Sequence, residues 1–390
     1  RGGAAGGGGR REGALTVRDI RLDGHPVWEG ERDGQEGVLS IRGPSGEVDA
    51  GFACAAEPPE EEPSWIVGWE PLLDAREDLV HHMDIFLCHR SVTEHWNLDD
   101  KYVCATDAFM VNHLEVVRPG RSPGGVGASV VQAVRDAKRG KRTERQLSGC
   151  SKLALAYDKG AGRYMLPEGF GYEVGPGTAS DHRFVLQNHY LVPPQWGNRG
   201  ARDSSGMRLF LTRERPQHVV SGFSMNDFGL RIPPEQPEFH YKFEEGAGVL
   251  LRSPLANDLN LAGGGGVRFV AVHLHTHNMA RRVWIDHMRD GVKIGEVARN
   301  DEYAGYGPDQ TFFDVLDPTA PLFQIGDGLV LNCVYNSTGV PKPTPYGVSH
   351  GTEMCAAFLV YADHNTSAVP RFGNMPSIQT KPRRSDFFLP

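Results

Sequence analysis

The sequence predicts an all-β protein made of two tandem antiparallel β-sandwiches. The chain has 390 residues, including 48 glycines and 27 prolines, and its apolar residues occur in short alternating runs without long heptad patterns. A chain of this length is expected to form two or three domains. Short strands separated by Gly- and Pro-containing turns favour sandwiches over helical architecture. A hydrophobic fraction of 39% still allows sizeable cores in so long a chain.

The first predicted domain spans residues 37–195. Residues 1–36 open with RGGAAGGGGRRE, a composition typical of a flexible segment. From residue 37 onward the pattern alternates, and three runs indicate strands that end at turn residues: SWIVGWEP, LVHHMDIFLC and HRFVLQNHYLV.

A basic insertion, at about residues 105–149, interrupts this domain. Within it, Val130, Val134 and Ala137 have helical spacing and are followed by a run of basic residues up to position 146. Aromatic side chains for base stacking are absent from this run. The insertion therefore indicates a short amphipathic surface helix rather than a nucleic-acid site.

The second predicted domain spans residues 196–370, and residues 371–390 form a tail. The Pro- and Gly-rich segment VPPQWGNRGARDSSG, at 192–206, indicates the boundary between the two domains. Beyond it, five runs indicate strands: MRLFLTR, VRFVAVHLHTH, RRVWIDHMRDG, GLVLNCVYN and EMCAAFLVYAD.

Charge and hydropathy limit the classes of partner. The formal net charge of −8 gives no field that would attract nucleic acid or an anionic membrane. No apolar run approaches the roughly 20 residues that span a bilayer. The chain begins at Arg1 without an initiator Met, which indicates a fragment or a processed product. We expect a small-molecule substrate and neither a nucleic-acid partner nor a membrane span in this chain; the oligomeric state is not indicated.

The cysteines indicate an oxidising compartment. None of them lies in a CxxC pair, so disulfides are favoured over a thiolate zinc site. Two N-x-S/T sequons, at Asn336 and Asn365, agree with a secreted or lumenal location. The pattern alone leaves fifteen pairings open for six cysteines. They are Cys54, Cys88, Cys104, Cys150, Cys333 and Cys355.

The run AVHLHTHNMA places His273, His275 and His277 at alternate positions. Side chains alternate between the faces of a strand, so all three imidazoles are expected on one face. Two such imidazoles can chelate one metal ion, although a polar face on an edge strand would give the same pattern. Because an HxH pair with one further ligand completes a site, we expect His273 to support a ligand or to line a substrate pocket rather than to bind the metal.

Four further residues extend this hypothesis. His81 and His82 are neighbours on a strand, so both can reach one metal only across a bulge or distortion. His189, taken alone, is more often a core or surface residue, and Met354 beside Cys355 is by default a core residue. Taken together, these residues would give two sets of three ligands. The first set is His81, His82 and His189, and the second is His275, His277 and Met354. A thioether selects copper(I), and three-ligand sites leave positions open for O2 or substrate.

The chain resembles the copper type II ascorbate-dependent monooxygenases over roughly residues 40 to 365. The runs VHHMDIFLC, FVLQNHY, DSSGMRLFLTR, LHTHNMARRV and GTEMCAAFLVY occur in that family's order and at about its spacing. The resemblance implies two jelly-roll-like sandwiches with one copper ion each. A first copper, held by His81, His82 and His189, would store an electron from ascorbate. A second, held by His275, His277 and Met354, would bind O2 for hydroxylation of a substrate C–H bond.

The resemblance also implies three disulfides and a substrate pocket. The disulfides are Cys54–Cys104, Cys88–Cys150 and Cys333–Cys355. In the peptide-amidating branch of the family, an Arg, an Asn and a Tyr hold the peptide carboxylate, whereas this chain has His273, Ala356 and Phe358 at those positions. Imidazole does not replace a bidentate guanidinium. We therefore expect a more apolar pocket, with Gln187 as a further lining residue.

Two other functions fit the same residues. A secreted metal-binding module would keep the sandwiches without turnover. A zinc hydrolase would use His81, His82 and His189 with a bound water. The hydrolase leaves Met354 unexplained, and the sequence shows no Asp or Glu beside these histidines that stands out as its base.

Overall fold

The computed structural model of the protein describes its strands and most of the turns between them. The described residues are 15–22, 60–74, 80–89, 152–176, 182–190, 202–227, 229–245, 265–304, 310–347 and 351–363, with short strand segments between 25 and 57. Within these residues the fold is all-β and contains no helix, as predicted. Accordingly, this part of the chain holds no helix with the length and hydropathy needed to cross a bilayer.

The first sandwich packs two sheets against each other. One sheet is antiparallel, in the order β5 (Leu39–Arg42), β6 (Val48–Glu57), β12 (His182–Tyr190), β8 (Val80–His89) and β9 (Lys152–Asp158). The facing strands are β1 (Thr16–Arg21), β14 (Gly206–Thr212), β7 (Ser64–Leu72), β11 (Phe170–Val174) and the short β10 (Tyr164–Met165). The core between them contains Ile66, Trp69, Ile85, Leu186 and Leu209, which are all fully or almost fully buried.

The second sandwich is built in the same way. One of its sheets contains β15 (His218–Asn226), β24 (Cys355–Asp363), β18 (Val267–Thr276) and β21 (Phe312–Asp314). The other contains β17 (Phe239–Glu245), β22 (Gly328–Tyr335), β19 (Ala280–Arg289) and β20 (Val292–Asn300). Three strand pairs complete the described residues: β2 (His25–Pro26) with β13 (Arg202–Asp203), β3 (Glu31–Arg32) with β4 (Gln35–Glu36), and β16 (Arg231–Ile232) with β23 (Thr344–Pro345).

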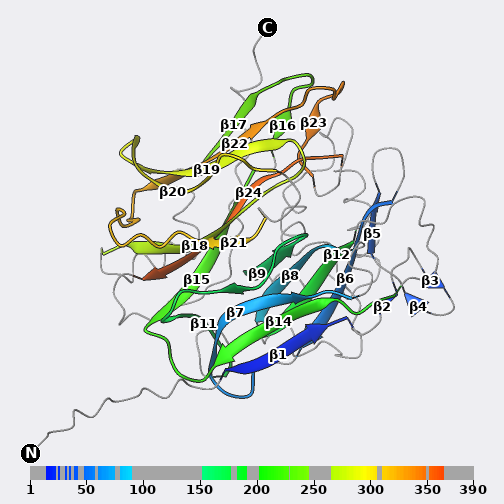
Figure 1. The fold of residues 1–390 in the computed structure, drawn as a ribbon, viewed down its shortest axis with the longest axis vertical. Helices are drawn as coiled ribbons and strands as arrows, with labels where there is room; N and C mark the ends of the chain where they lie inside the picture. The colour runs from blue at the N-terminus through cyan, green and yellow to red at the C-terminus, as the bar shows by residue number, and fades with distance from the viewer. Residues whose placement is uncertain are drawn as a thin grey trace, which may run out of the picture.

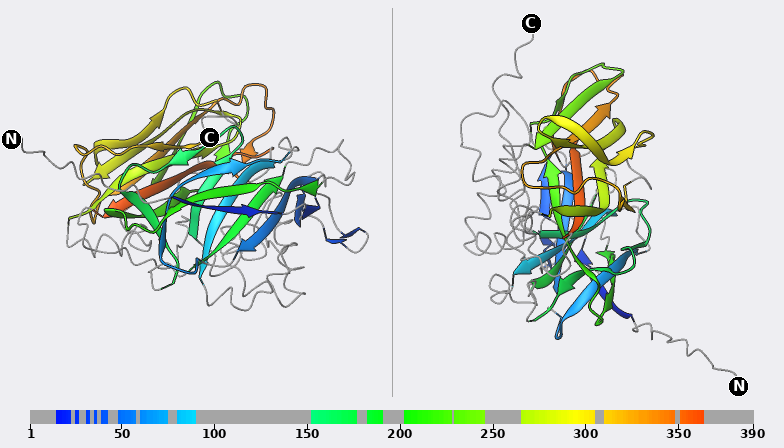
Figure 2. Two further views of the ribbon diagram at one scale, coloured as in Figure 1. Left: turned by 60° about the horizontal axis from the view of Figure 1, so that its bottom comes forward. Right: turned by 90° about the vertical axis from the view of Figure 1, so that its left-hand side faces the viewer.

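One sheet runs through both sandwiches. Strand β11 pairs in parallel with β15, through Phe170 with His218 and Tyr172 with Val220. This pairing joins the β1-β14-β7-β11 strands to the β15-β24-β18-β21 strands in a single nine-stranded sheet. The two sandwiches therefore lie next to each other along this sheet, with most strands of the first sandwich below those of the second in Figure 1 and again in the right-hand view of Figure 2.

Two parts of the predicted domain division differ from the structure. Strand β1 lies inside the segment 1–36 that we expected to be flexible, and it pairs with β14. Its residue Ile20 and the following Leu22 are fully buried in the first core. Strand β14 follows the predicted boundary, yet it pairs with β7 of the first domain. The partners of both strands are distant in the chain, so local pattern could not assign them to a sheet.

Other parts of that division lie outside the described residues. These are the basic insertion at about 105–149, its predicted helix and the tail at 371–390.

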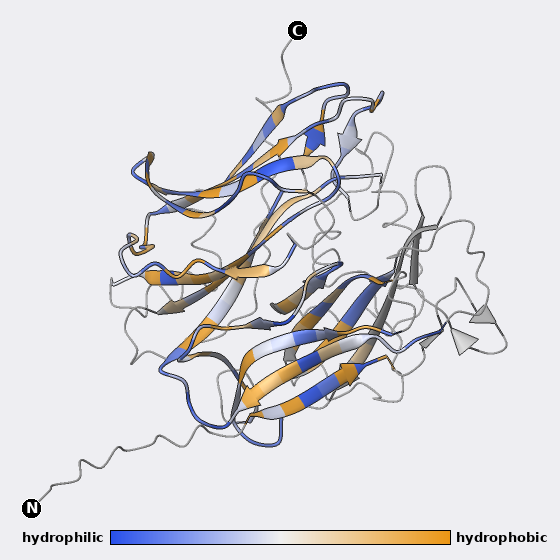
Figure 3. Ribbon diagram, viewed as in Figure 1, coloured by the Kyte–Doolittle hydropathy of each residue, from blue (hydrophilic) through white to orange (hydrophobic). Residues whose placement is uncertain are grey.

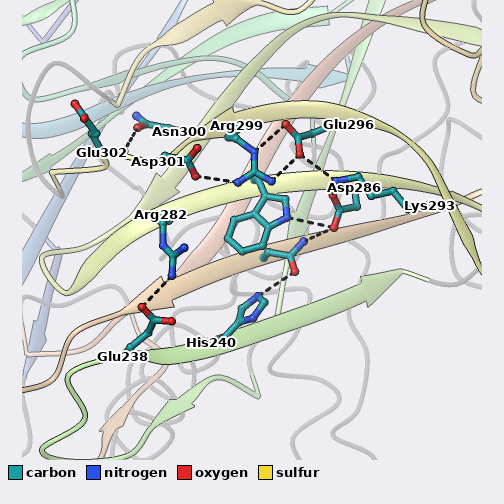
Figure 4. A network of polar contacts seen from close by, with 12 residues as sticks. Glu238, His240, Arg282, Asp286, Lys293, Glu296, Arg299, Asn300, Asp301 and Glu302 are labelled. Carbon is teal, nitrogen blue, oxygen red and sulfur yellow. Dashed lines mark hydrogen bonds and ion pairs between the residues drawn. The ribbon is translucent and has the colours of Figure 1, made fainter.

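Some strands mix polar and apolar residues, whereas others, such as β15 and β22, are buried along almost their whole length. Figure 3 shows the mixed pattern along β1 and β14, where hydrophobic and hydrophilic residues follow one another. In the second sandwich, one face of β19 and its neighbours carries a polar network (Figure 4). There the Arg299 guanidinium lies 4.7 Å from the centroid of the Trp284 ring and pairs with Glu296 at 2.7 Å. The opposite face of the same sheet supplies Ile285 and Leu331 to the second core.

The predicted disulfide between Cys333 and Cys355 is confirmed. It joins β22 to the start of β24 and so links the two sheets of the second sandwich. For the pairs Cys54–Cys104 and Cys88–Cys150, the cysteine side chains lie outside the described residues.

Candidate metal centres

The first candidate centre begins at a bulge in β8. His82 lies directly opposite His189 of β12, but the next pair joins Tyr190 to Val80, so β8 has one extra residue, His81, at this point. A bulge re-aims neighbouring side chains. The distortion that the adjacent histidines required is therefore present. It also explains why Val80 and Met83, three residues apart, both contact the first core.

The three imidazoles of this centre converge. The Nδ1 atoms lie 3.3 Å apart for His81 and His82, 3.2 Å for His81 and His189, and 3.1 Å for His82 and His189. Nitrogens bound to one metal at about 2.0–2.1 Å in tetrahedral directions lie roughly 3.3 Å apart. Three lone pairs this close would repel one another without a shared cation. The donor set consequently fits a metal ion such as copper or zinc.

The electrostatics of this centre favour the metal-binding form of the imidazoles. Burial lowers the pKa of His82 to about 4, although Asp158 acts in the opposite direction. Burial, with the neighbouring His82, lowers the pKa of His81 well below its ordinary value. Neutral imidazole is the form that binds metals, so these side chains need not lose a proton at neutral pH. His82 Nε2 faces Asp84 Oδ2 at 3.6 Å, in a position to orient the ring.

The second candidate centre lies on neighbouring strands β18 and β24. In their register, His273 is opposite Phe358 and His275 is opposite Ala356. Residues directly opposite each other in an antiparallel pair share a face. The same register continued beyond the last pair, Thr276 with Cys355, places Met354 opposite His277. The alternating histidines therefore share a face with the residues predicted at and after the start of β24, which are Met354, Ala356 and Phe358.

This face turns toward the first sandwich. Ala271 and Val360, on the same face, belong to the first core, and Phe358 packs against it. Leu274 and Ala357 point the other way, into the second core. The histidines thus occupy the boundary between the two sandwiches, and the ring centroids of His81 and His277 are only 6.4 Å apart.

The backbone around His277 and Met354 is fixed by Glu353. This buried carboxylate accepts hydrogen bonds from the backbone N–H of His277 at 2.8 Å and of Met279 at 2.6 Å. Burial raises the pKa of Glu353 to about 7. His277 Nδ1 donates to the carbonyl oxygen of Thr352 at 2.8 Å, which leaves Nε2 as the nitrogen for a metal. Burial, followed by the effect of His275, lowers the pKa of His277 to about 3.

A carboxylate that the sequence analysis missed lies between the two centres. Asp158 ends β9 and is paired with His82 of β8. Its Oδ2 lies 2.8 Å from His273 Nε2 and 3.4 Å from His275 Nδ1, and its Oδ1 lies 4.0 Å from His82 Nδ1. Asp158, His273 and His275 form a second group whose potential ligand atoms all lie within 4.8 Å of one another. The sequence shows no Asp or Glu beside the histidines that stands out as a base, and it is the pairing of β9 with β8 that brings Asp158 to them.

The charges in this group are coupled. Burial opposes ionisation of Asp158, but the attraction of His275 and a hydrogen bond from His273 hold its pKa well below the ordinary value. For His275, burial again opposes the charge, but Asp158 raises the pKa above its ordinary value. The carboxylate is thus negative at neutral pH and faces imidazoles of both sandwiches.

The predicted pocket residues lie around these centres. The rings of Phe312 and Phe358 lie 5.2 and 5.5 Å from His273. Ala356 is buried opposite His275. Gln187 is buried on β12, two residues before His189 and opposite Asp84, beside the first centre. The surroundings of His273 are therefore aromatic on two sides and acidic on a third.

Comparison with known proteins places the chain in a family. Residues 49–195 match the N-terminal domain, and residues 256–376 the C-terminal domain, of copper type II ascorbate-dependent monooxygenases. The chain belongs to the copper type II ascorbate-dependent monooxygenase family. The resemblance seen in the sequence motifs is thereby confirmed, and the two family domains follow one another in the predicted order.

Several curated proteins are similar to the chain. Tyramine beta-hydroxylase of Caenorhabditis briggsae is 25% identical over 302 residues, which is 76% of this chain and 42% of that protein. DBH-like monooxygenase protein 1 of Gallus gallus is 30% identical over 217 residues, 54% of this chain and 33% of that protein. Dopamine beta-hydroxylase of Canis lupus familiaris is 27% identical over 304 residues, with shares of 76% and 40%. The chain thus spans less than half the length of these relatives.

The comparison with solved structures gives no argument about function. The major capsid protein P2 of bacteriophage PM2 aligns over 89% of this chain and 97% of its own, at 9% identity and a TM-score of 0.26. So low a score carries no conclusion about this chain.

Proposed function

We propose that the protein is a copper- and ascorbate-dependent monooxygenase that uses O2 to hydroxylate a C–H bond of a small organic substrate. One observation carries the proposal: the Nδ1 atoms of His81, His82 and His189 converge within 3.3 Å of one another. That constellation lies in a chain of a copper monooxygenase family and beside an HxH pair on the facing sandwich.

In this proposal each sandwich holds one copper ion. His81, His82 and His189 bind the first, and His275, His277 and Met354 bind the second. Copper, when bound, supplies the redox chemistry that connects ascorbate and O2 to the substrate.

The chain's own residues prepare these sites. Burial keeps His81, His82 and His277 neutral and ready to bind. The Thr352 carbonyl fixes the ring of His277, and Glu353 fixes the backbone at His277 and at Met354. The chain's own contacts therefore hold His277 in one orientation, which lowers the cost of ordering it when a metal binds.

We propose an apolar or aromatic substrate. Phe312 and Phe358 flank His273, and the positions that hold a peptide carboxylate in the amidating branch carry no guanidinium. Relatives named for tyramine and dopamine hydroxylation agree with an aromatic amine as one candidate. A secreted or lumenal location belongs to the same proposal, because the Cys333–Cys355 disulfide is typical of oxidising compartments.

Metal analysis combined with oxygen uptake tests the proposal. Two coppers per chain and ascorbate-dependent O2 consumption are expected. Zinc without oxygen uptake would favour the hydrolase, and bound copper without uptake would favour a binding module.

A substrate screen tests the pocket. Phenethylamines, acylglycines and small apolar compounds would be compared for hydroxylated product. Turnover of a glycine-extended peptide as fast as that of the aromatic compounds would contradict the proposed pocket.

A further inference from the structure

The carboxylate of Asp158 reaches the second centre from the first sandwich. Its Oδ2 lies 2.8 Å from His273 Nε2 and 3.4 Å from His275 Nδ1. Donors that share one metal at about 2.0–2.2 Å are separated by roughly 3 to 3.5 Å. The two distances from Asp158 are close to this spacing, and the potential ligand atoms of all three residues lie within 4.8 Å of one another.

The second oxygen of Asp158 supports the same conclusion. Oδ1 is buried and accepts no hydrogen bond from any residue that the structure describes. A buried carboxylate oxygen without a hydrogen-bond donor is costly, and a cation is one group that can compensate it. Oδ1 faces His82 Nδ1 at 4.0 Å, so the carboxylate lies between the two histidine clusters.

We infer that Asp158 is a metal ligand of the second centre in its oxidised state, together with His273 and His275. His275 then belongs to two donor sets on one sheet face, one completed by His277 and Met354 and the other by His273 and Asp158. A thioether prefers Cu(I), whereas an anionic oxygen is a harder donor that suits Cu(II). The oxidation state of the metal selects the set.

This arrangement also ties the two halves of the protein together. Asp158 ends β9 of the first sandwich, whereas both histidines are on β18 of the second. A metal bound by all three bridges the boundary between the sandwiches. The inference rests on one part of the proposed function, namely that copper binds at the second centre.

Copper titration of the metal-free chain tests the inference. In a His189→Ala background, which removes a ligand of the first centre, Cu(II) and Cu(I) affinities are measured by chelator competition. Asp158→Asn is expected to weaken Cu(II) binding by about tenfold or more and to change the Cu(II) electron paramagnetic resonance spectrum. Cu(I) binding should stay within about twofold, because the proposed Cu(I) set lacks Asp158.

Two further variants make the result specific. Asp301→Asn in the same background is the matched control, because Asp301 is an exposed carboxylate beside β20 that pairs with Arg299 and should leave Cu(II) binding unchanged. Asp158→His should restore Cu(II) binding and add a third imidazole signal in pulsed resonance spectra, which a purely electrostatic role of Asp158 would not produce.

The outcomes separate this inference from the proposed function. Unchanged Cu(II) affinity and spectrum in Asp158→Asn would overturn the role of Asp158, while two coppers and ascorbate-dependent uptake in the wild type would leave the monooxygenase standing. Weaker Cu(II) binding in Asp158→Asn, combined with a wild type that shows no hydroxylation, would support the role of Asp158 as a ligand and reject the enzyme. A chain that binds no copper at the second centre would overturn both.

Discussion

His82 lies opposite His189 on the neighbouring strand, and their Nδ1 atoms are 3.1 Å apart. On its other side, His82 is paired with Asp158 of β9. A row of three polar side chains thus crosses three adjacent strands of one sheet. Such a row, buried at the boundary between two sandwiches, has a substantial desolvation cost and is expected to have a function.

Loss of His189 should remove the first copper selectively. We expect His189→Ala to bind one copper per chain instead of two and to lose at least about 100-fold in affinity at the first centre, because two imidazoles remain where three converged. Copper stoichiometry after dialysis measures this. Retention of both coppers at wild-type affinity would contradict the three-histidine centre.

Replacement of Met354 should separate copper binding from turnover. Met354→Ile keeps the size and hydrophobicity of the side chain but removes the thioether. Hydroxylation should be abolished, while copper at the first centre stays in place. Product formation and copper content, measured on the same sample, test this. Full activity in the variant would show that Met354 is not a ligand of the second centre.

The Cys333–Cys355 disulfide should stabilise the second sandwich. Its cysteines are 22 residues apart in sequence, and closing a loop of that size in the unfolded chain is worth about 3 kcal/mol. The double variant Cys333→Ser/Cys355→Ser should lose about that much free energy of unfolding in denaturant titrations. A loss below about 0.5 kcal/mol would mean that native packing already holds the two sheets together.

Asp327 should make the folded state sensitive to acid. Its carboxylate is 2.7 Å from His287 Nε2 and 2.7 Å from Arg289 Nε. Burial opposes ionisation, but Arg289, the Gln324 N–H and His287 hold the pKa of Asp327 below its ordinary value. The ionised form therefore stabilises the fold above about pH 4, and this contribution is lost as the pH falls through the folded-state pKa.

Asp327→Asn should reveal this contribution in the metal-free protein. We expect a loss of about 3 kcal/mol at neutral pH, because the variant leaves buried partners without their carboxylate. The loss should shrink on acidification below pH 4 in chemical unfolding curves. Arg299→Ala, in the exposed network on β19 and β20, is the comparison and should cost less than about 1 kcal/mol. An equal loss at all pH values would exclude the assigned titration.

Much of the architecture could be predicted because it depends on local pattern. Alternation predicted the strands, and His81 and His82 could share one metal only if a bulge or distortion interrupted β8. That bulge is present. The motifs around these residues were sufficient to recognise the family.

The remaining features depend on contacts between distant segments. Strand β14 could not be assigned to the first sandwich, because its partners β7 and β1 are far from it in sequence. Asp158 appeared as one acidic residue after the apolar run KLALAY. Only the pairing of β9 with β8 places it beside His82, and only the packing of the sandwiches brings it to His273. The register of β9 against β8 would have identified Asp158 as a neighbour of His82, but the sequence alone does not fix that register.

The parallel pairing of β11 with β15 limits how this protein can be divided. A fragment ending at residue 195 would lack β14 and would expose the main-chain groups of β11 that now bond to β15. Exposed edge strands pair readily with other chains. Each isolated half should therefore self-associate instead of folding as an independent monomer. A fragment designed to hold a single copper site should therefore retain the neighbouring strands or cover the exposed edge strand. Otherwise self-association would affect its copper spectra.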